Sequence, residues 1–196
     1  MRVLRVVSQV VVLALMAGAA QAAPISYIFT GTGSGAIGQV SFSDVLVTVV
    51  ATGDTDDVSG GDVLFNQNIA STVSIGGVGT FSISNETYVF DNQPDEKVGF
   101  GVKNIPVCCD IIQHQLPIYG TYDLRTALGP IPFAPQNLSI GDWIDVPTSG
   151  GLMTLRTMVD NTFEARVDAV PEPATASLIG AGLMVSALWR RRRHTR

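Results

Sequence analysis

Cysteine and histidine are scarce in this sequence, which limits the chemistry that it can support. The two cysteines, Cys108 and Cys109, are neighbours, and adjacent cysteines cannot link distant strands. A vicinal disulfide, two free thiols and bonds between chains all stay open for this pair. A second cysteine pair and a Cys-x-x-Cys motif are missing, which disfavours a zinc site. Only His114 lies outside the arginine-rich C-terminus. No Gly-x-Ser-x-Gly motif accompanies it, so we expect no catalytic triad and no enzymatic activity.

More than half of the basic residues, seven of twelve, lie at the two ends of the chain. The whole sequence carries 12 Lys plus Arg against 17 Asp plus Glu, with a formal net charge of −5. Residues 23–169 hold five of the basic residues and sixteen of the acidic ones, so this central part has a net charge near −11. A part this acidic lacks the basic patch that a phosphate backbone requires, which excludes nucleic acid as an expected partner.

The densest acidic stretch is a candidate calcium loop. Its carboxylates are Asp54, Asp56, Asp57 and Asp62, and calcium takes six to eight oxygen ligands. The spacing does not follow an EF-hand, because Val58 occupies the third ligand position and no glutamate closes the loop. We therefore favour a solvated turn between strands, with calcium as the alternative, and expect no other cofactor.

Long helical patterns are also missing from residues 23–169. Short runs rich in Val, Ile and Thr alternate with Gly, Asp and Pro about every ten residues, a pattern typical of strands and turns. We expect an all-β domain, an antiparallel β-sandwich or jelly roll. The segments 104–116, which contains Pro106, and 129–136, which contains three prolines, are expected to be long excursions from the sheets. The run 118–124 is expected to be a strand.

The N-terminus has the three parts of a secretory signal. Arg2 and Arg5 precede an apolar run over residues 6–20, and Ala20-Gln21-Ala22 places small residues where a signal peptidase requires them. The apolar run is short for a membrane span, which disfavours an uncleaved anchor. We predict that residues 1–22 are a signal peptide cleaved after Ala22.

The C-terminus combines a proline motif, an uncharged stretch and a basic cluster. Residues 174–189 carry no charge, and as a helix they would extend about 24 Å, slightly less than a hydrocarbon core of about 30 Å. The basic tail, residues 190–196, then stops transfer through the membrane. The sequence therefore predicts a transmembrane helix with the central domain outside. The stop-transfer residues are Arg190, Arg191, Arg192 and Arg193.

This arrangement resembles the PEP-CTERM sorting signal of Gram-negative bacteria, with a match over residues 170–196. The motif residues are Val170, Pro171, Glu172, Pro173, Ala174 and Thr175. The resemblance implies that an exosortase, an integral-membrane protease-transpeptidase, processes the tail after the secretion machinery has exported the chain. It also implies transient anchoring in the inner membrane, and then a place on the cell envelope, the outer surface or outside the cell. A plain membrane anchor is the alternative.

The role of the central domain is less determined than its destination. Composition and the resemblance favour a structural or adhesive protein of an exopolysaccharide or biofilm matrix, with exopolysaccharide as a further expected partner. A carbohydrate-binding module is the first alternative and needs exposed aromatic rings, of which Trp143 is the first candidate. A secreted hydrolase is the second alternative and needs converging polar groups in a cleft.

Overall fold

The computed structural model describes residues 22–104, 110–132, 138–140 and 143–168. The described residues fall within one compact unit, Ala22–Ala169. Its strands are β1 (Pro24–Ile37), β2 (Val40–Asp54), β3 (Val58–Gly60), β4 (Val63–Ile75), β5 (Gly79–Ser82), β6 (Thr87–Asn92), β7 (Lys97–Val102), β8 (Asp110–Gln115), β9 (Leu128–Pro132), β10 (Leu138–Ile140), β11 (Val146–Thr148) and β12 (Gly151–Val167). Two short 3₁₀ segments, η1 (Thr55–Asp57) and η2 (Pro117–Thr121), complete the described secondary structure.

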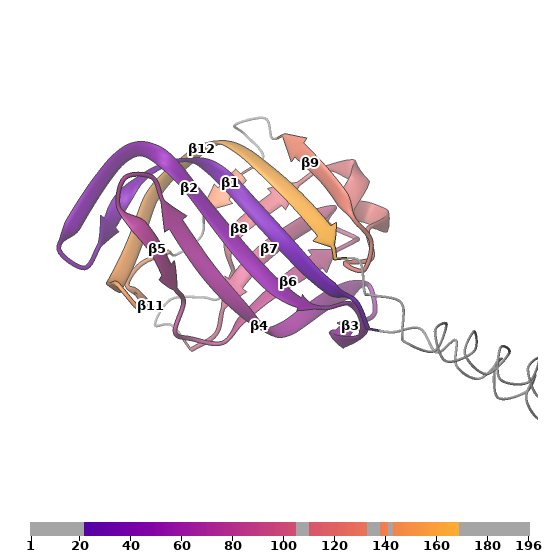
Figure 1. The fold of residues 1–196 in the computed structure, drawn as a ribbon. Coiled ribbons are helices and arrows are strands. Elements are labelled where there is room, and N and C mark those ends of the chain that lie inside the picture. The colour runs from indigo at the N-terminus through magenta and orange to yellow at the C-terminus, as the bar shows by residue number, and fades with distance from the viewer. Residues whose placement is uncertain (1–21, 105–109, 133–137, 141–142, 169–196) are drawn as a thin grey trace, which may run out of the picture. The chain divides into compact units, whose positions relative to one another are not determined.

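The strands form two antiparallel sheets that share the long strand β4. In the first sheet, β12, β1 and β2 are neighbours, and the C-terminal half of β4 continues from β2 to β5. In the second sheet, the N-terminal half of β4 pairs with β6, followed by β7, β8 and β10. Figure 1 shows β12, β1 and β2 side by side in front of β6, β7 and β8. The predicted all-β antiparallel architecture is confirmed.

Two edges of the first sheet meet instead of facing solvent. Beyond the end of β5, Ile83 forms a bridge with Thr148 of β11. Backbone hydrogen bonds run from Ser84 N to the Pro147 carbonyl and from Ser149 N to the Ser82 carbonyl, both at 2.9 Å. Pairing of this kind covers backbone groups that would otherwise template aggregation. At another edge, β9 contains Pro130 and Pro132, a residue type tolerated in strands mainly at edges.

Alternation along β1 places one face of the first sheet in the core, whereas β6 and β7 of the second sheet are buried on both faces. In β1, Ile25, Tyr27 and Phe29 are fully buried, whereas the intervening Ser26 and Ile28 are half-buried on the outer face. In β12, Phe163 packs against the rings of Phe29, His114, Tyr119 and Tyr122 at centroid distances of 5.0 to 6.2 Å. Side chains from both sheets therefore fill one continuous core.

Three local expectations from the sequence are wrong. Residues 110–115 of the expected excursion form β8, a strand between β7 and β10. Residues 128–132 form β9, because an edge position tolerates the missing proline N–H groups. The expected strand at 118–124 is instead η2 and the turn that follows it. There Tyr119 and Tyr122 are buried although they do not alternate as in a strand.

Candidate functional site

The outer face of the first sheet carries hydroxyl side chains in register across five strands. Thr30 of β1 lies opposite Thr162 of β12 on one side and Thr48 of β2 on the other. Thr48 in turn faces Ser74 of β4, and Ser74 faces Thr80 of β5. We call these five residues the hydroxyl row. With strands about 4.8 Å apart, four intervals extend the row over about 19 Å.

The residues that flank the hydroxyl row are mostly uncharged. On one side, Val159, Thr32 and Leu46 lie opposite one another, and Val159 and Leu46 are exposed. On the other side, the neighbouring positions are Glu164, Ile28, Val50, Thr72 and Ser82. The face therefore alternates hydroxyl groups with aliphatic surface, in contrast to the acidic composition of the domain as a whole.

Two of the charged side chains beside the hydroxyl row form an ion pair, whereas Asp160, in the β12 bulge between Val159 and Thr162, is exposed. Glu164 accepts two hydrogen bonds from the guanidinium of Arg166, at 2.7 and 2.8 Å. The hydrogen bonds from Arg166 hold the pKa of the Glu164 carboxyl below its usual value. Such a bidentate pair presents little net charge to a partner.

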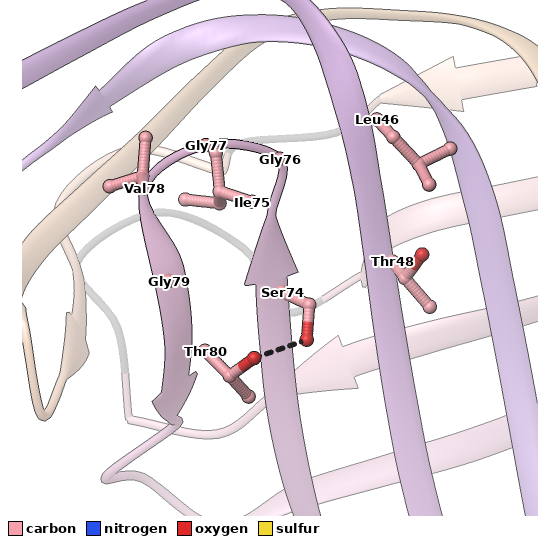
Figure 2. A pocket seen from close by; sticks show the side chains of 9 residues that line it. All are labelled: Leu46, Thr48, Ser74, Ile75, Gly76, Gly77, Val78, Gly79 and Thr80. Atoms are coloured by element: carbon pink, nitrogen blue, oxygen red, sulfur yellow. Dashed lines mark hydrogen bonds between the residues drawn. The ribbon is translucent and has the colours of Figure 1, made fainter.

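One end of the hydroxyl row borders a shallow hollow of about 430 Å³ (Figure 2). Leu46 and Thr48 line it from β2, and the Gly76-Gly77 turn between β4 and β5 closes it. Ser74 and Thr80 point toward each other here, with a hydrogen bond of 2.7 Å between their hydroxyl oxygens. Gly77 has a φ of +74°, a backbone conformation that glycine adopts without strain. The hollow is thus built from glycines and hydroxyl-bearing residues together with the aliphatic side chains of Leu46, Ile75 and Val78.

The structure places the calcium candidates in and around a short turn. The Asp54 carboxylate caps η1 by accepting a hydrogen bond from the Asp56 N–H at 2.9 Å. Asp57 and Asp62 are exposed. Across the part of the chain that the structure describes, no group of three or more His, Cys, Asp or Glu residues is arranged to hold a metal ion. A solvated turn stays the prediction for the four aspartates, with calcium binding as its alternative.

The aromatic residues considered as a sugar platform lie in the interior. Trp143 is fully buried, with its ring centroid 6.3 Å from that of Phe100. Tyr27 and Tyr119 are also fully buried, and Tyr88 and Tyr122 are exposed by less than a tenth. In this structure Trp143 therefore fills the core and presents no surface on which a sugar ring could stack.

His114, the histidine that a catalytic triad would require, is also a core residue. It is 1% exposed, and its ring meets those of Phe29 and Phe163 edge-on at 5.7 and 6.2 Å. Burial lowers the pKa of its imidazole from 6.5 to about 2. His114 is therefore neutral at physiological pH and is shielded from solvent.

Sequence reasoning missed one buried ionisable group, Asp91 of β6. Its side chain is fully buried, and neither carboxylate oxygen has a hydrogen-bond partner within the described residues. Burial, with a smaller contribution from Asp123, raises the pKa of Asp91 from 3.8 to about 7. A usable signal was present, because Thr87, Val89 and Asp91 share one face of a period-two strand.

Several predicted site residues lie outside the described residues. These are Cys108 and Cys109, the signal-peptide residue Ala20, the sorting motif at 170–175, the expected helix at 174–189 and the arginine cluster at 190–193. Ala22 is described and is half-buried before β1. No helix among the described residues is long and apolar enough to cross a membrane.

Comparison with known families identifies the C-terminus. A model of the PEP-CTERM protein-sorting motif matches residues 169–193. The chain is therefore a PEP-CTERM-containing protein, and the motif indicates an exported protein that is sorted at the cell envelope with exosortase as its processing partner. Neither a curated protein nor a solved structure matches the chain.

Proposed function

We propose that this protein is a non-enzymatic component of the cell surface or of an extracellular polysaccharide matrix, with a structural or adhesive role. The observation that supports the proposal is the hydroxyl row on the outer face of the first sheet. Each hydroxyl can both donate and accept hydrogen bonds, as sugar hydroxyls do. The aliphatic residues beside the row, such as Leu46 and Val159, offer surface for the C–H groups of sugar rings.

The distribution of charge on the domain favours contact with an uncharged region of a glycan. The domain carries an excess of acidic residues, which would repel anionic sugars, but the outer face of the first sheet holds the closed pair Glu164–Arg166. A polysaccharide could therefore approach this face without meeting an uncompensated carboxylate in the row. The same arrangement favours weak contacts repeated along a polymer over a deep, specific pocket.

The test replaces hydroxyls by methyl groups without changing shape. We expect Thr30→Val with Thr48→Val to reduce retention of the exported protein on extracellular polysaccharide from its host, measured by affinity electrophoresis. Val suits a strand as well as Thr does, so the fold should persist. Thr121→Val, at an exposed position in η2, is the matched control. Equal retention of the double variant and wild type would exclude the row as the binding surface.

The sorting part of the proposal has its own test. The tagged protein is expressed in its host with and without the exosortase, and its size and location are compared. We expect a longer, membrane-retained form in the strain that lacks the enzyme. Identical size and location in both strains would contradict processing by exosortase, whatever the outcome of the polysaccharide test.

A further inference from the structure

The start of β1 and the end of β12 lie next to each other at one end of the described domain. Ile25, near the start of β1, pairs with Val167, the last residue of β12. Beyond that pair, the Asp168 N–H donates to the Pro24 carbonyl at 2.9 Å, and the Thr55 N–H donates to the Ala23 carbonyl at 3.0 Å. The ordered hydrogen bonding of the domain therefore continues to Asp168, one residue before the matched sorting motif begins at residue 169.

This short connection limits how far the sorting enzyme can stay from the domain. Three residue steps separate Asp168 from Pro171, and a fully extended chain spans at most about 3.5 Å per residue. An enzyme that binds the Pro171-Glu172-Pro173 motif therefore works within about 10 Å of the Asp168 backbone. Because even a small domain is about 30 Å across, the enzyme must touch the end of the folded domain.

One surface at that end is a hollow of about 450 Å³ between β9 and the end of β12. Ala127, Leu128 and Gly129 line one side, and residues 164–168 line the other. Leu128 pairs with Ala165 across the two strands, which fixes the two sides relative to each other. Ala127 and Gly129 are exposed and small, so a partner can approach the backbone closely.

Two of the three charged side chains that line this second hollow, Glu164 and Arg166, pair with each other, and the third, Asp168, is exposed. The guanidinium of Arg166 is bound to the Glu164 carboxylate, and Val167 adds aliphatic surface that is 36% exposed. A protein partner could therefore cover the hollow without burying an unpaired Arg166 or Glu164 charge, a burial that would oppose association.

We propose that the hollow between β9 and the end of β12 is the surface against which exosortase seats the folded domain while it processes the tail. Recognition then has two parts, the sorting motif itself and the domain end that precedes it. The inference concerns the end of the first sheet, where Glu164 and Arg166 follow Thr162 of the hydroxyl row along β12, and it does not depend on polysaccharide binding.

The test uses the full chain in its host and follows the conversion of precursor to processed protein by pulse-chase. Ala127→Arg places a long side chain at the rim of the hollow, and Ala127 lies more than 40 residues from the motif in sequence. We expect the variant to be processed at least fivefold more slowly than wild type. Ala70→Arg, at an exposed alanine of β4, is the matched control and should be processed at the wild-type rate.

A spacer separates a lost contact from a folding defect. Ten Gly and Ser residues inserted after Asp168 add an average reach of about 17 Å, so the enzyme can reach the motif without touching the domain. We expect the spacer to restore processing of Ala127→Arg to within twofold of wild type with the same spacer. Processing of Ala127→Arg at the wild-type rate without the spacer, or equal slowing with and without it, would overturn the proposal.

Discussion

The two buried ionisable groups, Asp91 and His114, should oppose each other in the pH dependence of stability. Between about pH 4 and 6.5, the folded protein carries a proton on Asp91 and none on His114, because their pKa values are about 7 and about 2. The unfolded chain has the reverse arrangement, since the ordinary values are 3.8 and 6.5. Both states bind one proton on this pair, so the pair adds no slope to the free energy of unfolding in that range.

Asp91→Asn removes the proton-binding carboxyl of Asp91 and leaves His114 as the buried group of the pair that titrates. The unfolded variant then binds one more proton than the folded variant below pH 6.5, through His114. Its free energy of unfolding should therefore rise with pH by about 1.4 kcal/mol per unit relative to wild type. From pH 4 to 6.5 the relative change amounts to about 3 kcal/mol. His114→Leu should show the opposite slope, because Asp91 then loses its stabilising proton as pH rises toward 7.

The assay is urea denaturation of the exported protein at half-unit intervals from pH 4 to 7.5. Differences from wild type are compared at each pH, so that contributions from other groups cancel. Asp57→Asn, which removes an exposed carboxylate, is the control. The double variant Asp91→Asn with His114→Leu should run parallel to wild type. If Asp91→Asn alone also runs parallel to wild type, the reasoning from burial is refuted.

Three further predictions concern packing and metal binding. Phe163→Ala, which removes the ring at the centre of the aromatic core, should cost about 3–5 kcal/mol in urea denaturation, whereas Leu46→Ala on the exposed face should cost less than about 0.5 kcal/mol. Gly101→Ala should destabilise the domain and alter its near-ultraviolet circular dichroism, because the added Cβ would overlap the Tyr88 ring, whereas Gly61→Ala meets no atom within 4 Å and should be tolerated. Calcium should produce no thermal shift, and a shift that disappears in Asp56→Asn would show instead that the acidic turn binds it.

The sequence predicted the class of fold because alternation is a local property. Ile25, Tyr27 and Phe29 point to one side of β1 whatever the strand pairs with, so period-two patterns identified strands and their buried faces. The positions at which individual strands begin and end were harder to predict from the sequence. The run 118–124 contains Tyr119 and Tyr122, which are buried by the neighbouring sheet even though the backbone is not a strand. Proline-containing β9 was missed because edge position is decided by partners far away in the chain.

The candidate binding faces depended even more on long-range pairing. Thr30, Thr48, Ser74, Thr80 and Thr162 are unremarkable hydroxyl residues in the sequence, and only the register of four strand pairs places them in one row. Trp143 illustrates the reverse case. Its aromatic ring was the first candidate for a sugar platform under the alternative of a carbohydrate-binding module, but packing against Phe100 gives it a place in the core.

The sequence by itself determined the chain's destination. Signals for sorting are read as linear segments, so the match at residues 169–193 requires no tertiary structure to be recognised. It also determined that residues 23–169 are acidic and rich in strand-forming side chains. Only the tertiary structure decided which of those residues meet. The hydroxyl row, the enclosed Asp91 and the closeness of Asp168 to Pro24 depend on contacts between residues far apart in sequence, and local patterns do not determine which distant strands pair.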